Sequence, residues 1–144
     1  MDGMFLGYKS LISLDLSSHE TKFVSNMSSL FYDCWRWNNI TFNNILSSID
    51  LSNLDTSNVE DMNELFASCL ELKELNLDNL ENLKTSKVKN MNSMFFQLIS
   101  LTLLDLSNFD TTQIVTMNNM LDFYSSVKKL DLSNSNTSNV IDIS

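Results

Sequence analysis

The chain has 144 residues, which predicts one domain, and 43% of them are hydrophobic, enough to form a buried core. Its formal net charge of −9 repels phosphate backbones and anionic lipid headgroups, which argues against nucleic acids and membrane surfaces as partners. No apolar run approaches the roughly 20 residues that cross a bilayer, so we expect no membrane insertion, and this chain contains no recognisable signal peptide.

A repeated unit organises the whole sequence. Equivalent apolar positions recur at intervals of 26, 35, 29, 26 and 26 residues, at Met1, Met27, Met62, Met91, Met117 and Ile143. The shortest interval lies within the range of roughly 20–29 residues that is typical of leucine-rich repeats. We therefore predict a single repeat domain at 1–144, with five units at 1–26, 27–61, 62–90, 91–116 and 117–142, and expect it to be part of a longer array.

Each unit contains a segment in which apolar and polar residues alternate, such as Leu104-Asp105-Leu106. This period of two predicts a strand with one buried face. Three apolar columns repeat in phase: Leu14, Ile49, Leu75, Leu104 and Leu130; Leu16, Leu51, Leu77, Leu106 and Leu132; Val24, Val59, Val88, Ile114 and Val140. Because successive copies run in the same direction, the strands are expected to pair as a parallel sheet.

A second apolar pattern has helical spacing. In the third unit it comprises Val59, Met62, Leu65 and Phe66. Ser57 and Glu60 form a capping-box pattern, which predicts a short helix near 58–68. Its counterparts are predicted near 24–33, 88–97 and 114–123. The expected fold class is α/β: a leucine-rich-repeat-like solenoid with a parallel β-sheet on one face and short helices on the other.

The turns must form almost without the usual turn residues, since the chain has 2 Gly and no Pro. Asn, Asp and Ser are expected to supply this chemistry instead. In the turn at 107–111 we expect Asp110 and Thr111 to bond turn amides. A column of amides is expected to satisfy backbone groups of the neighbouring unit: Asn53, Asn79, Asn108 and Asn134.

The repeated motif LDLSNxDTSNV followed by MxxMF resembles the repeats of BspA-type bacterial surface proteins, mycoplasma surface lipoproteins and some protist surface proteins. The resemblance covers Met1 to Ile143 apart from the insertion at Trp35 to Asn44. It implies a surface-exposed or secreted protein with a binding or adhesion role and no enzymatic activity. Repeats of that family often carry Gly and Cys after the MF pair, whereas the corresponding positions here read Asp33-Cys34, Ser68-Cys69, Gln97-Leu98 and Phe123-Tyr124.

An acidic row is the first candidate binding site. Outward-facing residues of successive predicted strands are Asp15, Asp50, Asn76, Asp105 and Asp131. Strands about 4.8 Å apart would bring these side chains into line. Clustered carboxylates suit Ca²⁺ or a cationic ligand. The favoured alternative is that they keep an open sheet face soluble, because the spacing matches no calcium-loop motif, and we predict no metal site.

An aromatic insertion is the second candidate. It contains Trp35, Arg36, Trp37 and Phe42, and it holds both tryptophans of the chain. Insertions project from the edge of a repeat array, and Trp and Arg are common interface anchors. The equally weighted alternative is that the insertion folds back and buries Trp35 or Trp37.

Two cysteines and one histidine limit the chemistry. Cys34 and Cys69 occupy the same repeat position, so a disulfide or a thiolate site is conceivable, but two buried small side chains are favoured. With His19 alone, no base partner for a nucleophile and no glycine-rich phosphate loop, we predict no enzyme and no cofactor.

These observations favour a non-enzymatic binding module that recognises a protein or glycan. The alternative is a structural spacer within a longer array. In either case further repeats could stack end to end with this chain.

Overall fold

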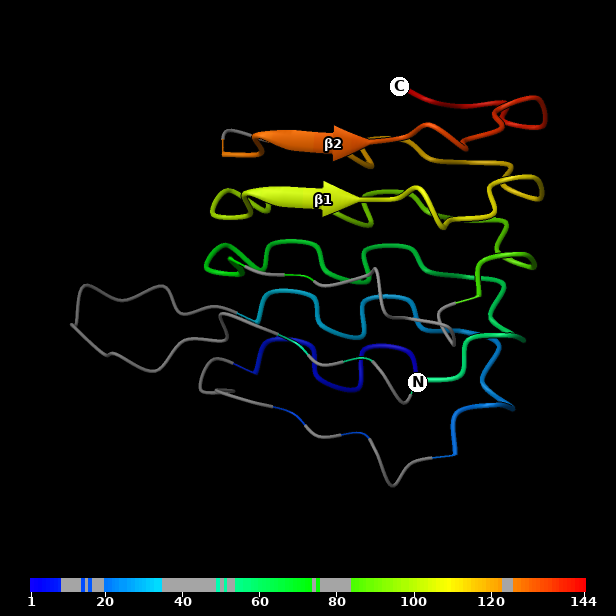
Figure 1. Cartoon of the computed structure of the whole chain (residues 1–144). Coiled ribbons are helices and arrows are strands. Elements are labelled where there is room, and N and C mark those ends of the chain that lie inside the picture. The colour runs from blue at the N-terminus through cyan, green and yellow to red at the C-terminus, as the bar shows by residue number, and fades with distance from the viewer. Residues whose placement is uncertain are drawn as a thin grey trace.

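The computed structural model describes residues 1–8, 14, 16, 20–34, 49, 51, 54–73, 75, 84–122 and 126–144. Its two strands are β1, Leu103–Asp105, and β2, Lys129–Asp131. They pair in parallel, with Leu104 opposite Leu130 and Asp105 opposite Asp131 (Figure 1). The parallel pairing expected from the sequence is therefore present in this pair.

The predicted α/β leucine-rich-repeat-like solenoid is wrong. The described residues contain no helix, and their only strands are the three-residue β1 and β2. None of the four segments predicted as helices, 24–33, 58–68, 88–97 and 114–123, is helical where it is described: consecutive turns occupy 28–33, 63–68, 92–97 and 118–122. Each segment also contains an isolated β-bridge residue: Asn26, Asp61, Asn90 or Thr116. No helix in the described part of the chain is long and apolar enough to span a membrane.

Left-handed backbone positions explain why these segments do not become helices. Within 58–68, Glu64 has a φ of 55° and Ser68 a φ of 60°. A helix needs a negative φ at every residue, so a left-handed residue every fourth position ends each turn. The apolar spacing of 3 and 4 is kept by these turns and still directs Met62 and Phe66 inward, where both are fully buried.

Hydrogen bonds between successive repeats replace the helical ones. The amides of Met62, Glu64 and Phe66 donate to the carbonyls of Asn90, Asn92 and Met94, at 2.9, 2.8 and 3.1 Å. Isolated parallel bridges continue this pairing along the chain: Asn26 to Asp61, Asp61 to Asn90, Asn90 to Thr116 and Thr116 to Asp142. The repeats therefore lie above one another as layers, which we define as 1–8, 21–34, 56–69, 85–98, 111–122 and 137–144 (Figure 1).

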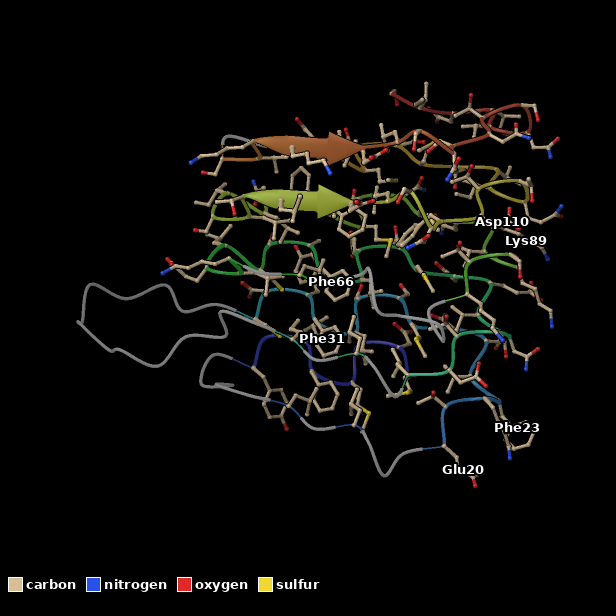
Figure 2. All side chains as sticks on the ribbon, viewed as in Figure 1. Glu20, Phe23, Phe31, Phe66, Lys89 and Asp110 are labelled. Atoms are coloured by element: carbon tan, nitrogen blue, oxygen red, sulfur yellow. The ribbon has the colours of Figure 1, made fainter. Side chains whose placement is uncertain are left out.

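A continuous apolar core runs through the layers. Its centre is a stack of phenylalanine rings: Phe5, Phe31, Phe66 and Phe95 lie in successive layers with centroids 5.6 to 6.0 Å apart (Figure 2). The apolar columns read from the sequence border this stack; Leu104, Val59 and Val88 are fully buried.

A column of buried threonines ties the layers at one corner. The hydroxyls of Thr21, Thr56, Thr85 and Thr111 donate to the carbonyls of Asp55, Lys84, Asp110 and Asn136, the residues that immediately precede the next layer. A threonine methyl adds apolar surface while its hydroxyl satisfies a carbonyl that burial would otherwise leave unpaired.

Candidate functional site

The described part of the acidic row consists of Asp105 on β1 and Asp131 on β2, which are register partners. Each carboxylate accepts the amide of a residue two positions later: Ser107 at 2.9 Å and Ser133 at 3.0 Å. The hydroxyl and amide of Ser107 hold the pKa of Asp105 below its usual value. Ser133 lowers the pKa of Asp131 in the same way, although the like charge of Asp105 acts to raise it. These carboxylates therefore cap local turns, which is a structural role.

The same turn device recurs throughout the described layers. Asp55 and Asp110 accept the amides of Ser57 and Thr112 at 2.9 and 3.0 Å. Turn bonding by Asp110 was expected from the sequence and is confirmed. Among the expected amide contacts, Asn134 donates to the carbonyl of Ser107 in the preceding repeat at 2.7 Å. Asn53 and Asn79 lie outside the described residues.

Most of the predicted binding residues also lie outside the described residues. These are Asp15 and Asp50 of the acidic row and Trp35, Arg36, Trp37 and Phe42 of the insertion. Within the described ranges, no group of three or more His, Cys, Asp or Glu side chains is placed to hold a metal ion.

Sequence reasoning missed an exposed corner that we name the lysine corner, comprising residues 20–23, 58–60 and 84–89. Phe23 is 81% exposed there, with the ammonium of Lys22 5.0 Å from its ring centroid. Figure 2 shows Glu20, Phe23 and Lys89 along the same edge of the stack. Four of the nine cationic residues of this acidic chain, Lys22, Lys84, Lys87 and Lys89, belong to this corner.

Hydrogen bonds between layers order the lysine corner. The side-chain amide of Asn58 donates to the carbonyl of Lys22 at 2.6 Å and accepts the ammonium of Lys87 at 2.5 Å. Lys89 lies 2.7 Å from Glu60 and lowers the pKa of that carboxyl through a hydrogen bond and its charge. Phe23 is the only apolar residue in a column that otherwise reads Asn58, Lys87, Gln113 and Asn139, and this substitution was the signal available in the sequence.

The cysteines occupy neighbouring layers, and both are free and buried, as favoured from the sequence. The Cys34 thiol donates to the carbonyl of Phe5 at 3.2 Å, and the Cys69 thiol to that of Phe31 at 2.9 Å. The neighbouring Cys69 thiol lowers the pKa of Cys34, whereas the neighbouring Cys34 thiol and burial raise the pKa of Cys69. A fully buried thiol with a raised pKa is a poor nucleophile, so the Cys69 thiol acts as a packing group.

An apolar cavity of about 440 Å³ opens at the end of the stack that carries the C-terminus. Its lining reaches into the core and includes Leu106, Phe109, Met120, Leu121, Leu132 and Ile143. Leu121 follows Met120 where the other repeats place a phenylalanine after Met or Leu, as in Met94-Phe95. The smaller side chain leaves the column less filled at this end.

Comparison with known proteins places the chain in a family. The sequence profile of DUF285, described as a Mycoplasma protein of unknown function, matches residues 1–45 and 40–144, and these two matches together span the whole chain. No curated protein and no solved structure gives a significant match. The chain therefore belongs to the DUF285 family of Mycoplasma proteins of unknown function.

Proposed function

We propose that this chain is a non-enzymatic binding module, displayed on the cell surface or secreted, that recognises a protein or glycan partner. The exposure of Phe23 carries this proposal. An aromatic side chain that is 81% exposed on an ordered, charged surface is a typical anchor for a partner. The resemblance of the repeats to BspA-type surface proteins supports the proposed location.

The chemistry of the lysine corner suits a polar partner. Phe23 offers an apolar face, while Lys22, Lys87 and the amide of Asn58 offer fixed hydrogen-bonding groups beside it. Hydrogen bonds to the neighbouring layer hold Asn58 in place, so little side-chain freedom is lost when a ligand binds. Sugars and protein surfaces both combine apolar and hydroxyl or carbonyl groups in this way.

Binding to immobilised glycans and to purified extracellular proteins tests the proposal. We expect the wild-type chain to retain at least one ligand, and Phe23→Ala to weaken that binding about thirtyfold, which corresponds to an anchor of about 2 kcal/mol. Leu103→Ala is the matched control, since Leu103 is exposed on β1, outside the lysine corner. Trp37→Ala examines the insertion separately. Wild-type binding by both Phe23→Ala and Trp37→Ala would refute both surfaces as the binding site.

A structural spacer is the second candidate, and the regular pairing of the layers favours it. The bridges from Asn26 through Asp142 join equivalent positions of five successive layers, as extension of an array requires. The binding assay separates the two functions, because a spacer retains no ligand on any glycan or protein surface.

A further inference from the structure

Two columns of side chains run through the lysine corner and continue beyond it along the side of the stack. Backbone hydrogen bonds define the second column: Glu60, Lys89, Val115 and Ile141 each donate an amide to the carbonyl of the column member in the layer before, at 2.8 to 2.9 Å. The first column lies two residues earlier in each layer. Taken layer by layer, the members of the two columns are Phe23 and Ser25, Asn58 and Glu60, Lys87 and Lys89, Gln113 and Val115, and Asn139 and Ile141.

Both columns face solvent in every layer, and all ten of their residues are exposed. This exposure is a property of the columns, because Lys87, Lys89 and Val115 are exposed although layers lie on both sides of them. Stacking of layers therefore does not bury this face of the molecule. Three apolar side chains stand on it: Phe23 and Ile141 are each 81% exposed, and Val115 is 36% exposed.

The chemistry along the two columns changes from apolar to cationic and back to apolar. Phe23 lies two layers before the layer of Lys87 and Lys89, and Figure 2 shows Phe23 and Lys89 along the same edge of the stack. Ile141 lies two layers after them and follows Val115 in the second column. Neighbouring parallel layers lie about 4.8 Å apart, so each apolar end is about 10 Å from the cationic centre along the stack. A ligand that contacts all three parts needs three groups with this spacing.

The cationic centre carries more positive than negative charge. Lys89 pairs with Glu60 at 2.7 Å, and Lys87 donates to the neutral side-chain amide of Asn58. Both ammoniums lower the pKa of the Glu60 carboxyl, so this carboxylate faces two positive charges. The three charged groups together leave one net positive charge. A carboxylate of a ligand complements it, on a chain whose formal net charge is otherwise strongly negative at −9.

The aliphatic end of this face favours a peptide over a sugar. The side chains of Val115 and Ile141 have no hydrogen-bonding groups, so a sugar placed against them would leave hydroxyls unpaired, which costs free energy. An apolar peptide side chain has no such cost. A peptide in polyproline II conformation has three residues per turn and rises about 3.1 Å per residue, so every third side chain points the same way at intervals of about 9.3 Å. This interval matches the spacing of about 10 Å between each apolar end and the cationic centre.

We propose that the two columns bind a peptide segment of a partner protein in polyproline II conformation, with apolar residues at its first and seventh positions and a carboxylate at its fourth. One apolar residue contacts Phe23, and the other contacts Val115 and Ile141. The carboxylate lies between Lys87 and Lys89. This inference rests on the proposed function, because it names the partner of the same corner. The apolar contacts supply most of the affinity, since an exposed ion pair changes affinity by at most about fivefold, and the carboxylate selects the position of the peptide.

Nuclear magnetic resonance titration of the isotope-labelled chain tests the proposal, because it detects weak binding and locates it on the surface. The probe is the heptapeptide Leu-Pro-Pro-Glu-Pro-Pro-Leu, whose prolines hold it in polyproline II conformation. The amide signals of Phe23, Lys87 and Ile141 are expected to shift. Replacing the central Glu of the peptide by Gln should weaken binding about three- to fivefold. Replacing both Leu by Ser should weaken it about tenfold or more.

A charge reversal separates recognition from folding. Lys87→Glu should weaken binding of the Glu peptide and strengthen binding of a peptide with Lys in its place, a rescue that damage to the fold cannot produce. Lys128→Glu is the matched control, because Lys128 is exposed, directly precedes β2 and lies outside both columns. It should keep the wild-type preference for the Glu peptide. Ile141→Ser should weaken binding of the Glu peptide about tenfold through the lost apolar contact.

Three outcomes contradict this proposal. The first is the absence of any shift in the two columns at millimolar concentrations of the Glu peptide. The second is equal affinity for the Glu and Gln peptides. The third is tighter binding of a heparin-type sulfated oligosaccharide at the same amides, which would identify an anionic glycan as the partner. If Phe23→Ala then weakens binding of that glycan, the proposed function stands while the peptide proposal fails. If Phe23→Ala changes the binding of no ligand, the lysine corner is not the binding site.

Discussion

Replacing the aromatic side chain of Phe66 tests whether the stack of phenylalanine rings joins the layers. Phe66 is fully buried, and its ring lies between those of Phe31 and Phe95, with centroids 5.6 and 6.0 Å away and planes inclined by only 2° and 11°. Replacing a buried Phe by Ala costs about 3–5 kcal/mol through lost burial and the cavity left behind. Each ring pair contributes about 0.5–1.5 kcal/mol beyond its burial.

Phe66→Leu isolates the contribution of the ring. Leucine keeps most of the apolar volume, so the expected loss is that of two ring contacts, about 1–3 kcal/mol. A domain of ordinary stability, about 5–15 kcal/mol, remains folded after this change. Urea unfolding followed by far-ultraviolet circular dichroism should show a lower midpoint with an unchanged slope.

Phe5→Leu is the matched control for this experiment. Phe5 lies at the end of the stack, partly exposed, with one stacked neighbour, Phe31, and an edge contact to Tyr8. It should lose less free energy of unfolding than Phe66→Leu. If Phe66→Leu costs no more than Phe5→Leu, the stack does not join the layers and the core depends on apolar burial alone.

Three further predictions follow from the layer contacts. Thr85→Val should lower the free energy of unfolding by about 1–3 kcal/mol, because the carbonyl of Asp110 loses the hydroxyl donor of the buried Thr85. Thr85→Ser keeps the hydroxyl and should retain most of that free energy; equal losses for the two variants in urea titrations would contradict this. Thr112 lowers the pKa of Asp110, so Asp110 binds a proton more readily in the unfolded chain than in the folded one. The resulting contribution to stability is present above about pH 4 and disappears as the pH falls through the folded pKa. Asp110→Asn should therefore reduce the acid dependence of the urea midpoint. Cys34 and Cys69 should react with a thiol reagent only after unfolding, and rapid labelling of the native chain would show that the core opens around them.

Burial was predictable from the sequence because it depends on periodicity alone. The residues of the Leu104 and Val59 columns are buried wherever layers cover them on both sides. Turn bonding was predictable for Asp110 because an Asx residue followed two positions later by Ser or Thr is a local signal. Neither signal depends on which secondary structure carries it.

The helices could not be distinguished from turns by the same reasoning. Apolar spacings of 3 and 4 fit both a helix and a run of left-handed turns, and the deciding hydrogen bonds connect residues about 28 positions apart, such as Met62 with Asn90. The residue types at the left-handed positions did not indicate turns either, since Glu64 and Gln97 are types that favour helices. The lysine corner was missed because its single signal, Phe23, lies in a column of polar residues that has no chemical motif.

Because the chain has few glycines, most of its left-handed turn positions carry side chains, which costs free energy. Both glycines of the chain, Gly3 and Gly7, have a positive φ and lie in the first layer. The equivalent positions in the later layers are left-handed despite their Cβ atoms: Ser29, Asp33, Glu64, Ser68, Ser93, Gln97 and Asn119. Each such residue costs about 1–2 kcal/mol relative to a right-handed conformation.

Interlayer hydrogen bonds offset this cost at the same residues. Glu64 and Ser68 each donate an amide to the following layer at 2.8 Å, and the Ser29 hydroxyl donates to the carboxylate of Glu64 at 3.0 Å. A bond of this kind contributes about 0.5–1.5 kcal/mol, close to the cost of one left-handed residue. The turn geometry is therefore stable only where a neighbouring layer accepts these bonds, which makes each layer dependent on the next.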